Sequence, residues 1–118
     1  MTEQVDVQEL VIGVGTVLAF VLYGYGTFLR ETILGVAATD LAVGAFAGTF
    51  LVVAVLHGAY GRRDFAVAHA AAGAGLVFVA AASSGPEVLV GILLLVAGGS
   101  YVAVATMRAR RDRRAVQG

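Results

Sequence analysis

The chain has 118 residues, which favours a single domain. Hydrophobic residues make up 59% of it and charged residues only 14%, whereas a soluble domain is about one quarter charged. The formal net charge is zero, and cysteine is absent, so the chain itself supplies no disulfide, zinc–thiolate site or iron–sulfur cluster.

Four long apolar runs predict four membrane-spanning helices. A helix that crosses the ~30 Å hydrocarbon core needs about 20 mostly apolar residues. We predict spans at residues 10–29, 33–60, 65–82 and 88–107, followed by a basic tail at residues 108–118. Because the connections are short, the predicted fold class is an all-α integral membrane protein, built as a four-helix up-down bundle with residues 1–118 in one domain.

The first span carries one polar face. Residues spaced alternately three and four apart fall on one side of a helix, and here they are Gly13, Thr16, Phe20, Tyr23, Thr27 and Arg30. Polar groups are costly in hydrocarbon, so we expect this face to point into the bundle or toward a neighbouring subunit. Threonine hydroxyls can also bond to carbonyls of their own helix, which leaves a purely local role open.

The role of Asp40 depends on where the second helix begins. If it begins at Leu41, Asp40 is an N-cap at the membrane surface. If it begins near residue 33, Asp40 lies about 10 Å deep, level with Tyr23 and Thr27. The apolar segment before Asp40 favours the deeper placement, which makes Asp40 the one intramembrane acid and a candidate ion or proton group. A structural cap, or an ion pair between Asp40 and Arg30, remains the alternative.

Glycines mark the expected helix contacts. The second span contains Gly44 and Gly48 in a GxxxG pattern, which allows close approach of another helix. We expect Gly73 and Gly98 to serve the same purpose in the third and fourth spans.

Two histidines, His57 and His69, flank the charged turn at residues 61–64 and lie at similar depth. Helical projection places His57 on a bulky apolar face with Phe46 and Phe50, which we expect to face lipid. It places His69 on a stripe of small residues, packed in the bundle and hydrogen-bonded to a carbonyl or hydroxyl. Because the two faces disagree, we predict no bound cofactor, and contact of His69 with a haem or quinone is only a third hypothesis. We also predict no metal site, since Asp64 is the one further ligand at that level and is expected to be exposed.

The arginines predict the orientation. With four spans, both termini and the turn at residues 61–64 share one side, and that side holds every arginine except Arg30. The positive-inside rule then places both termini in the cytoplasm of a cell-membrane protein. The tail arginines are Arg108, Arg110, Arg111, Arg113 and Arg114. They fix topology in the simplest interpretation, and binding of anionic lipid is the alternative. No aromatic platform accompanies them, so we do not expect nucleic acid as a partner.

These features predict a structural or accessory subunit that contacts lipid and associates with copies of itself or with other membrane subunits. The alternative is a small transporter or channel, with Asp40 as ion or proton group, Arg30 as its partner, and Thr16, Tyr23 and Thr27 as lining. No phosphate-binding loop follows a strand, and no serine–histidine–acid set is arguable, so we do not expect an enzyme.

Overall fold

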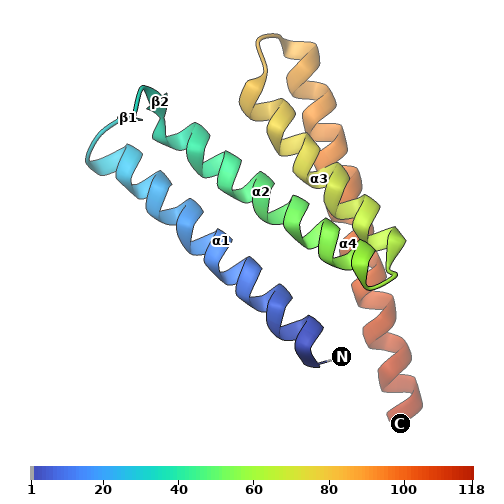
Figure 1. The fold of residues 1–118 in the computed structure, drawn as a ribbon. Coiled ribbons are helices and arrows are strands. Elements are labelled where there is room, and N and C mark those ends of the chain that lie inside the picture. The colour runs from blue at the N-terminus through green and yellow to red at the C-terminus, as the bar shows by residue number, and fades with distance from the viewer. Residues whose placement is uncertain (1) are drawn as a thin grey trace.

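The computed structural model describes residues 2–118, with side chains from residue 6 onward, and consists largely of four helices (Figure 1). They are α1 (Thr2–Phe28), α2 (Ala38–Ala59), α3 (Arg63–Ala81) and α4 (Gly85–Gln117). Each contains an apolar stretch long enough to cross a membrane. The predicted all-helical class and the four candidate spans are confirmed, and they indicate a small multi-pass membrane protein.

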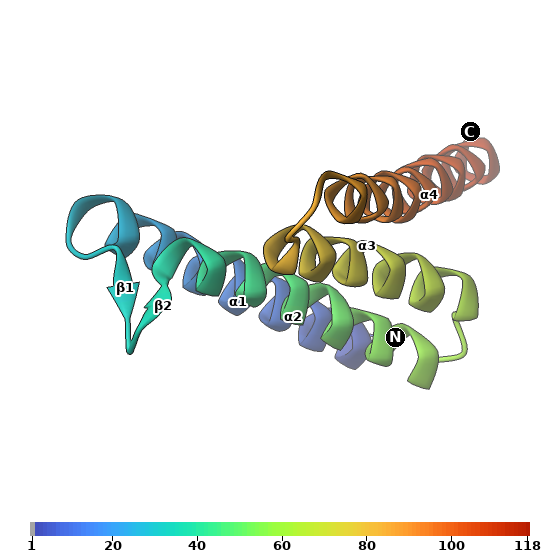
Figure 2. The same ribbon diagram turned by 90° about the horizontal axis from the view of Figure 1, so that it is seen from above.

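Successive helices run antiparallel and pack side by side in the order of the sequence. α1 packs on α2, α2 on α3 and α3 on α4, whereas helices that are not neighbours in sequence make only marginal contact. Both chain ends and the α2–α3 turn lie at one end of the molecule (Figure 1), and the four helices form an open row when seen from above (Figure 2). The arrangement is therefore more open than a closed four-helix bundle.

The connections at both ends of α3 have local causes in the sequence. Ser84 and Glu87 form a capping box at the start of α4, next to Pro86 in its first turn. At the end of α2, Gly61 has a φ of 79°, and its N–H donates to the carbonyl of Gly58 while the Arg62 N–H donates to that of His57. This pair of bonds is a Schellman motif, which needs a residue such as glycine in the left-handed region.

The preferred start of the second helix near residue 33 is wrong. β1 (Thr32–Ile33) pairs antiparallel with β2 (Val36–Ala37), and α2 begins only at Ala38. Leu34 and Gly35 link the strands with φ values of 51° and 83°, as a two-residue type I′ turn requires. The hairpin satisfies backbone groups of this apolar segment by cross-strand bonding, so the segment does not need to be helical.

Two helices are longer than predicted. α1 begins at Thr2, ahead of the apolar run, and α4 continues to Gln117 through most of the basic tail. Glutamate, glutamine, alanine and arginine all have good helix propensity, so a helix started in an apolar run continues through such flanks.

The core consists mainly of small side chains. The least exposed residues include Ala19, Ala38, Ala42, Ala47 and Ala72. Small residues let helix backbones approach closely, which suits packing within a membrane. The larger side chains that are buried include Phe65 and His57, and these two lie together near the α2–α3 turn.

Candidate functional site

The two histidine rings lie side by side where α2 and α3 meet. Their centroids are 4.9 Å apart, and Phe65 lies 5.2 Å from the ring of His57. His57 is only 7% exposed. The expectation that His57 faces lipid is therefore wrong. Its helix lies between α1 and α3, so a face that looked outward by projection is covered from both sides.

Hydrogen bonds set the orientation of both rings. The Nδ1–H of His69 donates to the carbonyl of Phe65 at 2.8 Å, as expected for a histidine that packs in the helix array. Since Nδ1 carries this proton, Nε2 of neutral His69 has a free lone pair. The side-chain amide nitrogen of Gln8, from α1, lies 3.5 Å from Nδ1 of His57. The histidine–aromatic cluster, defined as Phe50, His57, Phe65 and His69, thus connects α2 and α3 and is reached by α1.

The geometry of this cluster does not suit paired haem ligation. Axial imidazoles lie on opposite sides of the porphyrin, with the iron between them. Here the two rings are in direct contact at a mutual tilt of 39°, which is the geometry of a packed aromatic pair. Within the described part of the chain, no group of three or more histidine, aspartate or glutamate side chains could hold a metal ion.

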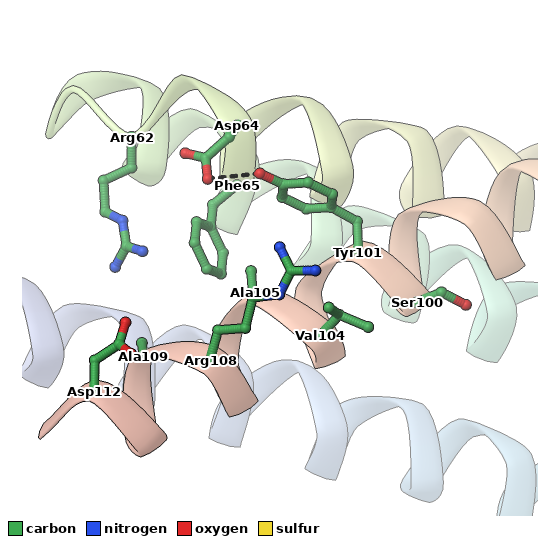
Figure 3. Close-up of a pocket in the computed structure, with 10 residues that line it drawn as sticks. All are labelled: Arg62, Asp64, Phe65, Ser100, Tyr101, Val104, Ala105, Arg108, Ala109 and Asp112. Atoms are coloured by element: carbon green, nitrogen blue, oxygen red, sulfur yellow. Dashed lines mark hydrogen bonds between the residues drawn. The ribbon is translucent and has the colours of Figure 1, made fainter. Parts of the chain in front are cut away.

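A groove runs between the start of α3 and the second half of α4, beside the histidine–aromatic cluster (Figure 3). Its volume is about 650 Å³. Phe65, at 8% exposure, contributes to the floor, and the Arg62 guanidinium lies over its ring at 4.0 Å. The Tyr101 hydroxyl, from α4, donates to the Asp64 carboxylate at 3.0 Å. Arg108 and Asp112 complete the charged lining of this α3–α4 groove.

Asp40, the predicted ion or proton group, lies on the exposed side of α2. Ala38, fully buried, contacts Gly26 of α1, and Asp40 lies two residues later on the opposite side of α2, where it is exposed. Asp40 is in the first turn of α2, and no side-chain cap bond is made at that helix end. Its role as an ion or proton group stays a prediction.

The polar face of α1 is open. Tyr23 is 58% exposed, and Thr27 and Arg30 are also exposed, whereas Thr16 is half-buried. Phe20 of the same face lies edge-on to Phe46 of α2 at 6.4 Å. The part from Tyr23 to Arg30 therefore does not point into the row of helices, which leaves a neighbouring subunit as its predicted contact. The Thr27 hydroxyl donates to the Tyr23 carbonyl at 2.9 Å, the local bond that threonine in a helix can make.

The four predicted packing glycines divide into two pairs. A methyl group at Gly73 would meet Leu51 and the Ala47 carbonyl, and one at Gly98 would meet Ala68 and Ala72. These glycines lie at helix contacts within the chain. A methyl group at Gly44 or Gly48 would meet nothing within 4 Å, so the GxxxG face of α2 is open.

Of the five tail arginines, Arg108 lines the α3–α4 groove. The others, Arg110, Arg111, Arg113 and Arg114, are exposed on the last part of α4. Sequence reasoning missed Arg62, Asp64 and Tyr101 as a group. Antiparallel packing of α3 on α4 would have placed the start of one helix beside the second half of the other, but the sequence does not reveal which faces meet.

In comparisons with known proteins, no family model matches the chain, and no curated protein or solved structure matches it either.

Proposed function

We propose that this protein is a structural or accessory membrane subunit that assembles through its helix faces, with copies of itself or with other membrane proteins. The observation that carries the proposal is the open glycine face of α2. Gly44 and Gly48 lie in a candidate membrane span, one turn apart, with free space above both. Such a pair lets a second helix approach closely, and close packing is a main source of helix association in lipid.

The exposed face of α1 supports the same role. Tyr23 presents a polar group on the outside of a candidate span, where contact with lipid is costly, and Arg30 is exposed just beyond the end of that span. A neighbouring subunit would cover them. We propose no enzymatic activity, and we place the protein in the cell membrane with both termini in the cytoplasm.

The test compares two glycines that both have free space around them. Gly48→Leu fills the open face of α2, and Gly99→Leu adds the same side chain at an open position of α4. Native mass spectrometry of gently extracted protein gives the mass of each assembly. We expect the wild type and Gly99→Leu to form the same assembly, and Gly48→Leu to dissociate.

The composition of that assembly identifies the partner. Multiples of the chain mass support a homo-oligomer, and unrelated chains in fixed ratio support a larger complex. A monomeric wild type, or an assembly that Gly48→Leu leaves intact, would contradict the proposal.

A further inference from the structure

The side chains that line the α3–α4 groove change in a regular order along α4. Gly98 lies against Ala68 and Ala72, which sets the register of the two antiparallel helices. Because the helices are antiparallel, a step of eight residues forward from Gly98 in α4 corresponds to a step of eight residues backward in α3. Position 106 of α4 is therefore level with Arg62. The apolar part of α4 ends at Met107, so Arg62 and Arg108 are both close to the edge of the apolar region, with Val104 one turn before Arg108. In Figure 3 the Phe65 ring is drawn between the two guanidinium groups.

Asp112 lies one helical turn beyond Arg108, about 6 Å further toward water at 1.5 Å per residue. Along α4 the groove therefore offers Val104, then Arg108, then Asp112, and Arg62 and Phe65 line its opposite side. Figure 3 shows Arg62, Arg108 and Asp112 around the same opening. The other carboxylate, Asp64, already accepts the Tyr101 hydroxyl.

We propose that the α3–α4 groove binds one phospholipid with a phosphoethanolamine headgroup. Such a lipid has the same order of groups: an acyl chain, a phosphate, and an ammonium group on the water side of the phosphate. Arg108 and Arg62 bind the phosphate, and each guanidinium can donate two hydrogen bonds to it. The ammonium group donates to Asp112, and an acyl chain follows Val104.

The balance of charge selects this headgroup. The lining holds two arginines and two aspartates. A purely anionic headgroup would meet the Asp112 carboxylate without a cation to offset it. A choline group carries positive charge but has no N–H to donate. The volume of about 650 Å³ is within the range of pockets that hold small ligands, ~300–1,000 Å³. This site does not depend on the proposed assembly.

The test is native mass spectrometry of the wild type in detergent micelles, with phosphatidylethanolamine, phosphatidylcholine and phosphatidylglycerol of identical acyl chains added in equal amounts. We expect a single phosphatidylethanolamine adduct, favoured about fivefold over each of the other two, as an exposed charge pair supplies. Asp112→Asn is expected to abolish that preference and Arg108→Gln to weaken all three adducts.

Matched variants separate the groove from general charge effects. Arg111→Gln removes the same charge from α4 outside the groove, and Asp6→Asn removes an exposed carboxylate from α1. Both are expected to keep the wild-type preference. Preferred binding of phosphatidylglycerol, equal binding of all three lipids, or a preference unchanged in Asp112→Asn would overturn the proposal. Circular dichroism of each variant confirms that the helices are intact.

Discussion

Among single residues, Phe65 joins the largest number of the features described above. Its ring contacts both histidines, lies edge-on to Tyr101 at 6.3 Å, and supports the Arg62 guanidinium. We expect Phe65→Ala to destabilise the protein by about 3 kcal/mol, because it leaves a cavity among these groups. Thermal unfolding in detergent, followed by circular dichroism, measures this. Phe28→Ala is the control, since Phe28 is 83% exposed and its loss should change little.

Leu34 is a second residue with a specific expectation. It is fully exposed at the tip of the hairpin and has a φ of 51°, which is unfavourable for a residue with a branched side chain. Asparagine followed by glycine is the preferred pair in a type I′ turn. Leu34→Asn should therefore raise stability by about 0.5–1 kcal/mol. Leu29→Asn, also at an exposed position, makes the same polarity change without relieving a strained backbone, and an equal gain in that variant would contradict this explanation.

Residue-level placement could be predicted from the sequence only in part. The similar distances of His57 and His69 from the turn correctly put the two at similar depth, because antiparallel helices joined by a short turn keep that register. Helical projection failed for His57 because it gives a direction on one helix and does not say where the neighbouring helices lie. The same limit hid the contact between Asp64 and Tyr101, which come from different helices.

At the scale of elements, adjacent glycines of α4 give a direct test of packing. A methyl group at Gly98 would collide with the backbone of α3 at Ala68, whereas one at Gly99 would meet nothing within 4 Å. We expect Gly98→Ala to cost about 1–3 kcal/mol through overpacking and Gly99→Ala to be close to neutral. Equal melting temperatures for the two variants would show that α3 and α4 do not pack in this register.

The four helices themselves were predictable because a continuous apolar run of about 20 residues is a strong signal. Their ends were not. The start of α2 depends on a hairpin whose residues are as apolar as the helix that follows, so hydropathy gave no boundary at Ala38. The missing signal was Gly35, which supplies one of the two positive φ values of the turn.

At the scale of the whole molecule, the open row separates the two ends of the helices by charge. The end with both termini and the α2–α3 turn (Figure 1) holds all arginines but one. The exception, Arg30, lies in the chain between α1 and the hairpin, at the other end. We therefore expect this arginine-rich end to be cytoplasmic.

Because the chain has no cysteine, single cysteines report this orientation directly. A membrane-impermeant maleimide applied to intact cells should label Ser83→Cys, in the α3–α4 connection, and leave Gly118→Cys unlabelled until the membrane is opened. The reverse pattern would contradict the predicted topology.

Replacing the five tail arginines with glutamine leaves Arg62 and Arg63 opposed by Arg30. If charge sets the orientation, the bias then falls from seven against one to two against one. Part of the population should then expose Gly118→Cys on intact cells, because the remaining difference in charge is small.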